Sequence, residues 1–264
     1  RDHRRLLHVL DLLPVIELRD VHKSFGEKHV LRGLDLRVDA GETLVVLGQS
    51  GSGKSVTLKI IVGLLEPDSG TVRIGDVDVT RADRKTLREA RRGIAFLFQT
   101  GALVNWMTVR ENVALPLVEQ RRLKRDEIDR RVEQALSALG MAEAADQLPE
   151  FISGGMRKRA ALCRVMVQDP SAVLYDEPTA GLDPILGRTV ARMIRDVHER
   201  HERAALVVTH DLELAFAVAD RIGLHHEGRL VEVGTPGEFR RSRHPVVRAF
   251  LDGTDEPPQG DPPP

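Results

Sequence analysis

A glycine-rich run followed by lysine and serine is the strongest chemical signal in the sequence. The run is Gly48-Gln49-Ser50-Gly51-Ser52-Gly53-Lys54-Ser55, which matches G-x-x-x-x-G-K-[ST] at every fixed position. Such a loop directs consecutive backbone N–H groups at phosphate oxygens, and a helix that follows adds its positive dipole end. We expect Lys54 to reach the β- and γ-phosphates of a nucleotide, Ser55 to bind Mg²⁺ through its hydroxyl, and Thr57 to belong to the same site.

Two other interpretations of this run are possible. One is a glycine-rich turn with an exposed lysine. The other is a dinucleotide-binding loop of the pattern G-x-G-x-x-G, but Val56 stands where its third glycine would be and the Lys54-Ser55 pair would have no role. A strand pattern before the run and a helix after it favour the phosphate site.

Two adjacent carboxylates, Asp176 and Glu177, follow the apolar residues 172–175. Successive residues of a strand point to opposite faces, so one carboxylate can hold Mg²⁺ while the other faces an attacking water. We expect Asp176 to take the metal and Glu177 to act as general base or to position the water. In isolation such a pair is more simply a polar strand end; its combination with the phosphate loop favours hydrolysis.

A histidine, His210, follows a third apolar run at residues 205–208. Like residues 43–47 and 172–175, this run is continuously apolar, as central parallel strands buried on both faces are. A parallel sheet presents its ligand site at the carboxyl ends of its strands, so the three polar endings should meet. We expect His210 to lie beside the γ-phosphate and to donate a hydrogen bond to it.

The rest of the chain predicts an α/β fold with two further parts. Residues 15–18, 34–38 and 71–74 alternate apolar and polar side chains, which is typical of half-buried antiparallel strands. Between residues 100 and 160 helical periodicity dominates. The clearest amphipathic helix places its apolar residues at Ile128, Val132, Ala135, Leu136 and Leu139.

Composition limits the function classes. The 264 residues include 39 Lys and Arg against 40 Asp and Glu, so no excess of positive charge indicates nucleic acid as a partner. The single cysteine, Cys163, is expected to be a buried apolar residue. No apolar run approaches the roughly 20 residues that span a bilayer, so attachment to a membrane would require a partner.

The segment Phe151-Ile152-Ser153-Gly154-Gly155-Met156-Arg157-Lys158-Arg159 completes a set of motifs. Together with the phosphate loop, the carboxylate pair and His210, it resembles the ATP-binding cassette subunit of an ABC transporter over about residues 15–251. The resemblance implies a P-loop NTPase (RecA-like) core with an antiparallel β subdomain and a helical signature subdomain. It implies hydrolysis of ATP, with Mg²⁺, coupled to transport.

The same resemblance divides the chain into parts. The nucleotide-binding core is expected at 15–99 and 161–239, the helical subdomain at 100–160 and a C-terminal helix at 240–251. An N-terminal extension is expected at 1–14, and a Pro-rich, disordered tail at 252–264.

Further site residues follow from the family pattern. Ser153 is a natural helix N-cap, and Gly154 and Gly155 expose amides beside it. The resemblance implies that this segment binds the γ-phosphate of ATP held by a second cassette, and we expect the two cassettes to form a homodimer. Gln99 matches the Q-loop glutamine, which touches Mg²⁺ or the attacking water. Asp183 matches the D-loop.

An aromatic residue stands at the family's adenine-stacking position. Phe25 occurs there in place of the usual tyrosine and retains the ring. The alternative is a core aromatic residue near a turn. Val104 to Leu117, with Trp106, is our candidate surface for docking a membrane subunit, and the alternative is the core of the helical subdomain.

Smaller motifs are similar to one branch of the family. Met156 replaces the signature glutamine and Ile152 the signature leucine, and Ser-Gly-Gly-Met-Arg-Lys-Arg resembles the lipid-asymmetry (Mla-type) cassettes. That branch implies phospholipid transport with an integral membrane permease and a mammalian-cell-entry domain protein, at the cytoplasmic face of the inner membrane. Another importer or exporter cassette is the first alternative.

Two further classes are disfavoured. Cassette ATPases that act on DNA or ribosomes usually carry long insertions or two cassettes, whereas this chain has one cassette and a short stretch between Ser55 and Ser153. A nucleotide-dependent regulator without turnover would not need Glu177 and His210.

Overall fold

The computed structural model describes residues 15–201 and 203–254. The expected extension at 1–14 and residues 255–264 of the expected tail lie outside the described residues. The strands are β1 (Ile16–Phe25), β2 (Lys28–Val38), β3 (Thr43–Leu47), β4 (Ser69–Ile74), β5 (Val77–Asp78), β6 (Ile94–Leu97), β7 (Ala172–Asp176), β8 (Ala204–Thr209), β9 (Arg221–His226) and β10 (Arg229–Gly234). The α-helices are α2 (Lys54–Ile61), α3 (Arg84–Ala90), α4 (Val109–Gln120), α5 (Arg125–Ala138), α6 (Gly154–Met166), α7 (Pro184–His201), α8 (Leu212–Val218), α9 (Pro236–Arg240) and α10 (Pro245–Asp252).

Two sheets organise the described part of the chain. One has the order β10-β9-β3-β8-β7-β6, in which β3, β6, β7, β8 and β9 are parallel and β10 pairs antiparallel with β9. The other is antiparallel, with the order β2-β1-β4-β5. The predicted α/β class is confirmed, with an antiparallel sheet beside a parallel core.

The central strands separate two hydrophobic cores. Successive side chains of β3 alternate between them: Val45 and Leu47 enter one, and Leu44 and Val46 enter the other. All five residues of β3 are buried, as are those of β7. The continuously apolar runs of the sequence are therefore the strands that are covered on both faces.

The parallel register brings four strand ends to one edge of the sheet. Leu47 of β3 pairs with Thr209 of β8, Asp176 of β7 pairs with Val208, and Leu97 of β6 pairs with Tyr175. The segments that follow these strands carry the phosphate loop, Glu177, His210 and Gln99, so the expected meeting of the strand ends is confirmed.

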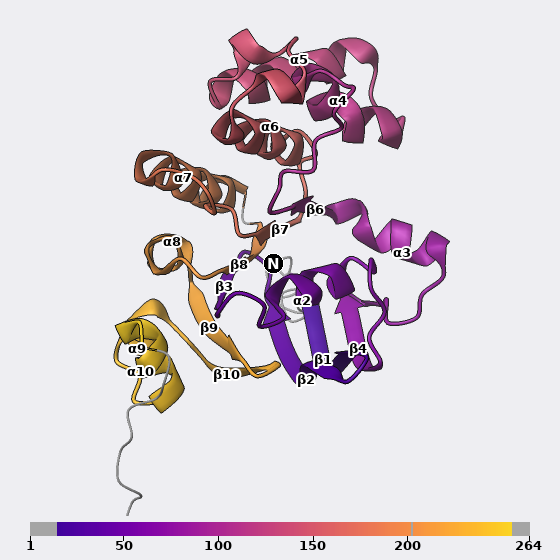
Figure 1. The fold of residues 1–264 in the computed structure, drawn as a ribbon. Helices are drawn as coiled ribbons and strands as arrows, with labels where there is room; N and C mark the ends of the chain where they lie inside the picture. Colours follow the sequence, from indigo (N-terminus) through magenta and orange to yellow (C-terminus); the bar gives the residue numbers. More distant parts are fainter. Residues whose placement is uncertain (1–14, 202, 255–264) are drawn as a thin grey trace, which may run out of the picture.

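Helices α4, α5 and α6 pack together at one end of the molecule, and the antiparallel sheet lies at the other (Figure 1). On α5 the predicted apolar face is buried, with Ile128, Val132 and Leu136 in the same core as Cys163 of α6. Helix α6 begins after Ser153 and continues to Met166, so the expected boundary at residue 160 falls inside one helix.

The C-terminal part differs from the single helix expected at 240–251. The structure has two short helices, α9 and α10, separated by residues 241–244. Pro245 occupies the first turn of α10, where its missing N–H costs nothing, and it disfavours helical geometry at the preceding residue. A new helix therefore begins there.

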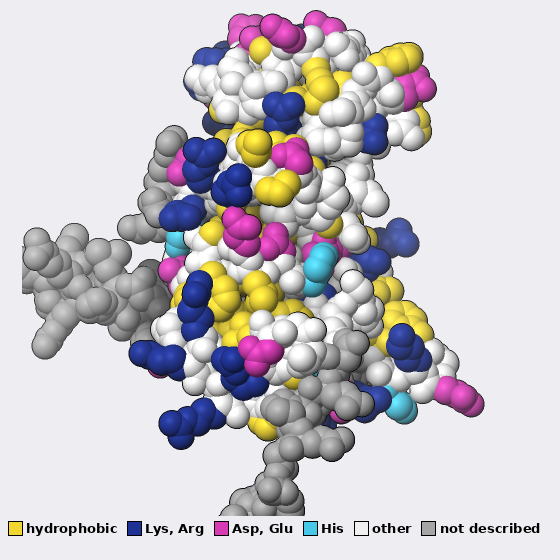
Figure 2. Space-filling model, turned by 60° about the vertical axis from the view of Figure 1, so that its left-hand side comes forward, with side chains coloured by type: hydrophobic (Ala, Val, Ile, Leu, Met, Phe, Trp, Pro, Cys, Tyr) yellow, Lys and Arg dark blue, Asp and Glu magenta, His cyan; other side chains and the backbone are white. Residues whose placement is uncertain are grey.

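Among the residues that the structure describes, no helix combines the length and the apolar character that crossing a bilayer requires. The face shown in Figure 2 carries both basic and acidic side chains, interspersed with hydrophobic ones.

Candidate active site

The phosphate loop connects β3 to α2, and its shape depends on glycine. Gly51 and Gly53 have φ of 78° and 116°, in the left-handed region. At Gly48 a Cβ atom would lie 2.7 Å from the backbone oxygen of His225, so no side chain fits there. Gly53 is the N-cap of α2, and the helix therefore presents its N-terminus at the loop.

The ammonium group of Lys54 lies inside this loop. Its Nζ donates to the carbonyl oxygens of Gly48 at 2.6 Å and Gln49 at 2.9 Å, and it lies 3.6 Å from Oε1 of Glu177. Lys54 is only 5% exposed, and this burial lowers the pKa of its ammonium, with the Glu177 carboxylate acting in the opposite direction. Lys54 lines the same cavity as Ser50, Gly51 and Gly53 of the loop.

Ser55 and Asp176 form a pair of hard oxygen ligands. The Ser55 hydroxyl donates to Oδ1 of Asp176 at 2.8 Å. Burial raises the pKa of Asp176, and the charge of Glu177 raises it further, while the Ser55 hydrogen bond lowers it. Within the described residues no group of three or more His, Cys, Asp or Glu side chains could hold a metal. The pair fits Mg²⁺, which keeps waters and phosphate oxygens as most of its ligands.

Glu177 is fixed by three donors from β8 and the residue after it. Its Oε2 accepts from the Thr209 hydroxyl at 3.0 Å, from Nδ1 of His210 at 2.9 Å and from the His210 backbone N–H at 3.4 Å. An ionised carboxylate only accepts, so Nδ1 of His210 carries a hydrogen and Nε2 is free to accept in the neutral ring. Oε1 of Glu177 faces Lys54. The structure thus joins Glu177, His210 and Lys54 in one network.

A cavity of about 380 Å³ is lined by several of the predicted residues. Gln99 is exposed at its rim, and Phe25 lies at the end of β1 with 47% of its surface exposed. The accessible ring of Phe25 contradicts the interpretation as a core aromatic. The cavity is lined by Phe25, Lys28, Val30, Ser50, Gly51, Gly53, Lys54, Ser55, Val56, Gln99 and Glu177.

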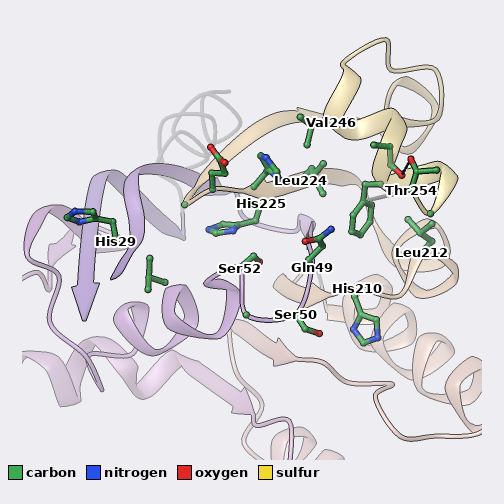
Figure 3. A pocket seen from close by; sticks show the side chains of 18 of the residues that line it. His29, Gln49, Ser50, Ser52, His210, Leu212, Leu224, His225, Val246 and Thr254 are labelled. Atoms are coloured by element: carbon green, nitrogen blue, oxygen red, sulfur yellow. Dashed lines mark hydrogen bonds between the residues drawn. The ribbon is translucent and has the colours of Figure 1, made fainter. Parts of the chain in front are cut away.

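An adjoining cavity of about 700 Å³ lies beside the loop (Figure 3). Gln49, Ser50 and Ser52 line it together with His210. Thr57, in contrast, points into α2, where its hydroxyl donates to the Gly53 carbonyl at 3.2 Å. Its side chain therefore stabilises the loop-to-helix junction.

The signature segment lies apart from these residues. Ser153 accepts from the Met156 backbone N–H at 3.2 Å and caps α6, as its type predicted, and Gly154 is exposed beside it. None of the described residues that line the Phe25 cavity belongs to the segment 153–155. Asp183 caps α7 by accepting from the backbone N–H groups of Ile185 and Leu186, and it lines a separate groove.

Two residues near the site were not predicted from the sequence. Lys158 of α6 donates to the backbone oxygens of Gln99 and Glu177. Helical spacing offered a signal for it, because Lys158 shares a buried face with Ala161, Leu162 and Val165. His225 of β9 is 2% exposed and lies against Gly48 and Gly53 of the loop. Its neighbour His226 is exposed, and because residues 222–225 are all buried without alternation, the sequence pattern gave no signal for His225.

Comparison with known proteins places this arrangement in a family. A family model described as ABC transporter matches residues 31–180. The chain is 40% identical over 261 residues to the protein Trigalactosyldiacylglycerol 3, chloroplastic, of Arabidopsis thaliana, covering 92% of this chain and 75% of that one. It is 40% identical over 238 residues to the probable ribonucleotide transport ATP-binding protein mkl of Mycobacterium leprae, covering 90% and 69%.

A solved structure agrees with these relatives. It is a dimeric, post-hydrolysis state of an ATP-binding cassette bound to ADP and phosphate, with a TM-score of 0.78 and 30% identity over 84% of this chain and 98% of that one. The P-loop core, the antiparallel sheet and the helical part therefore follow a known ATPase architecture. The chain belongs to the ABC transporter family, of which it is an ATP-hydrolysing cassette subunit.

Proposed function

We propose that ATP and Mg²⁺ bind in the cavity between Phe25 and Glu177 and that Glu177 drives hydrolysis there. The observation that carries the proposal is the position of Glu177, whose carboxylate is held by His210 and faces the Lys54 ammonium at the carboxyl edge of the sheet. The adenine would stack on Phe25, and the loop from Gly48 to Gly53 would bind the phosphates through its N–H groups.

The chemical step follows from these positions. The oxygen of a water forms a bond to the γ-phosphorus, the bond from that phosphorus to the bridging oxygen breaks, and ADP leaves with the electron pair. Glu177 orients the water and accepts its proton, Lys54 stabilises the phosphate charge, and His210 positions the Glu177 carboxylate through Nδ1–H. Mg²⁺, held by Ser55, Asp176 and Gln99, would neutralise charge on the phosphate oxygens.

A second cassette would complete each site. Ser153, Gly154 and Gly155 present a capped helix N-terminus away from the cavity of their own chain, which suits the γ-phosphate of ATP held by a partner copy. Asp183 would contact the partner from the start of α7. The dimeric state of the solved ADP-bound relative supports this arrangement.

An integral membrane permease would dock beside the helical part. Trp106 is 83% exposed in the segment between β6 and α4, directly after the Gln99 loop, while Val113 and Leu117 of the same candidate surface are buried. The core interpretation therefore holds for Val113 and Leu117, and the exposure of Trp106 supports the docking interpretation. Docking there would place the chain peripherally, at the cytoplasmic face of the inner membrane.

Phospholipid is the proposed cargo, delivered with a mammalian-cell-entry domain protein. The support is the Ser-Gly-Gly-Met-Arg-Lys-Arg segment and the relative whose name contains a diacylglycerol lipid. A ribonucleotide is the second candidate, because the mycobacterial relative carries that word in its name.

Purification of the native complex tests the proposal. The full chain, tagged, would be extracted gently from membranes, and its associated proteins and lipids identified by mass spectrometry, with the untagged strain as control. A multi-span permease, a mammalian-cell-entry protein and bound phospholipid are expected. A permease with a different substrate-binding partner would overturn the lipid cargo, and nucleic acid or ribosomes without a permease would overturn the transport role.

A further inference from the structure

The basic side chains of α6 point toward backbone carbonyls of neighbouring loops. Arg157 donates to Pro149 and Ile152, Arg159 donates to Leu139 and Gly140, and Arg164 donates to Gly101 and Ala102. Lys158 alone among these four reaches the catalytic strand end. Its Nζ donates to the backbone oxygen of Glu177 at 2.7 Å and to that of Gln99 at 3.2 Å.

The Glu177 backbone needs such support. Glu177 has a φ of 47°, in the left-handed region, which costs a non-glycine residue about 1 kcal/mol or more. Strained backbone of this kind persists only where its surroundings hold it. Here the Glu177 N–H donates to Val208 at 2.9 Å, and its carbonyl accepts from both the Ala180 N–H at 3.2 Å and Lys158.

We propose that Lys158 is a positioning residue for hydrolysis, which holds the main chain of Glu177 and Gln99 in its own chain through one ammonium group. The inference rests on the proposed role of Glu177. Lys158 is 5% exposed, and the hydrogen bonds of its ammonium go to Gln99 and Glu177 and not to the phosphate loop. Lys158 therefore positions the Glu177 carboxylate and the Q-loop residue Gln99. Nucleotide binding depends on Lys54 and the phosphate loop instead.

The ammonium suits this position chemically. A lysine offers three donors from one atom, so it can satisfy two carbonyls that converge from different strands. Burial lowers the pKa of Lys158, while the charges of Glu177 and Asp176 raise it, so the carboxylates favour the charged form. An uncharged side chain of similar shape would leave both carbonyls without this donor.

The test compares Lys158→Met with Arg159→Met in the full chain. Lys158→Met is expected to lower kcat for ATP hydrolysis by about 10- to 100-fold, because small displacements of a catalytic group cost rate in this range. KM and ATP-dependent dimerisation should stay within about twofold of the parent. Arg159→Met removes a carbonyl donor from the same helix without touching Glu177, so its kcat should remain within about twofold.

Mixed dimers give a sharper readout. A chain with Ser153→Arg paired with a chain with Lys54→Ala has one complete site, which uses Glu177 of the first chain. Lys158→Met added to the first chain should lower kcat, and added to the second it should not. If the substitution only disturbed helix α6, it should lower kcat whichever of the two chains carries it. Lys158→Arg, which retains donors, should recover part of the rate and supplies the comparison if the methionine variant does not fold.

The proposal is overturned if Lys158→Met turns over ATP within about twofold of the parent, or if its loss matches that of Arg159→Met. Glu177→Gln measured alongside separates the two proposals. Full turnover by Glu177→Gln would remove the role assigned to Glu177, whereas inactive Glu177→Gln with fully active Lys158→Met would refute only the positioning role.

Discussion

At the scale of single residues, the site depends on charges that are buried together. Lys54 and Glu177 are 5% and 8% exposed and lie 3.6 Å apart. A buried ion pair contributes little net stability, but removal of one partner leaves an uncompensated charge. This arrangement is suited to function. When a phosphate binds, its oxygens can replace Glu177 as the partner of the Lys54 ammonium, and the Glu177 carboxylate then becomes available to a water.

His225 gives a residue-scale prediction on pH and stability. Burial, followed by the charge of Lys54, lowers the pKa of His225 from 6.5 to about 4. The folded protein therefore keeps His225 neutral, whereas the unfolded chain takes up a proton as the pH falls below 6.5. The stability that this difference contributes is complete above pH 6.5 and is lost progressively toward pH 4.

His225→Leu should remove that dependence. Between about pH 7.5 and about pH 5, urea unfolding of the variant should lose about 2 kcal/mol less free energy of unfolding than the parent loses. His226→Leu, at the exposed neighbouring position, should behave as the parent does. Parallel pH profiles for the parent and His225→Leu would contradict the prediction.

Residue types that follow the ends of buried strands carried most of the prediction of the site. The phosphate loop, Asp176, Glu177 and His210 could be found because they directly follow buried strands. Lys158 could not be assigned a role, since the carbonyls that it binds belong to residues 59 and 19 positions away in the chain. The left-handed backbone of Glu177 likewise depends on these distant contacts.

At the scale of elements, a buried asparagine joins α4 to the segment that carries Trp106. Oδ1 of Asn112 accepts from the Val104 N–H at 2.7 Å, and Nδ2 donates to the carbonyls of Val104, Met107 and Thr108 at 2.9–3.0 Å. Asn112 is fully buried. One side chain thus satisfies backbone groups of the turn that precedes α4.

Asn112→Ala should therefore destabilise this part strongly. We expect the free energy of unfolding to fall by roughly 2 to 4 kcal/mol, because buried backbone groups lose their partners. Asn105→Ala, at an exposed position of the same segment, should change it by less than about 0.5 kcal/mol. Urea denaturation measures both. Equal midpoints for the two variants would show that Asn112 does not stabilise the segment.

Elements with strong patterns were predictable and their ends were less so. The strand at Thr43–Leu47 is observed as predicted because both faces are buried, and α5 follows its apolar stripe. The break between α9 and α10 was missed, although Pro245 marks it. Packing of α6 against the core also extends that helix beyond the boundary that motif positions indicated.

At the scale of the whole molecule, each site is proposed to be shared between two chains. Ser153→Arg should block one half of a site, and Lys54→Ala should block the other half. Each variant alone should hydrolyse little ATP, whereas a mixture should recover at most one working site per mixed dimer. Steady-state turnover of the separate and mixed proteins measures this.

A matched control distinguishes loss of the contact between the two chains at Ser153 from loss of the α6 helix cap. Ser153→Ala removes the hydroxyl that caps α6, at a cost of about 1 kcal/mol, without adding bulk at the interface. Ser153→Ala should retain ATP-dependent dimerisation and turnover better than Ser153→Arg does. Full activity of Ser153→Arg alone, or recovery of two sites on mixing, would contradict a shared site.

The most direct test of the account is Glu177→Gln. The variant keeps the shape of the side chain and loses its basicity, so turnover should fall by about 100-fold or more while ATP binding and ATP-dependent dimerisation persist. Glu213→Gln, at an exposed acidic residue of α8, is the control and should turn over ATP as the parent does. Turnover of Glu177→Gln within about twofold of the parent would show that another group handles the water.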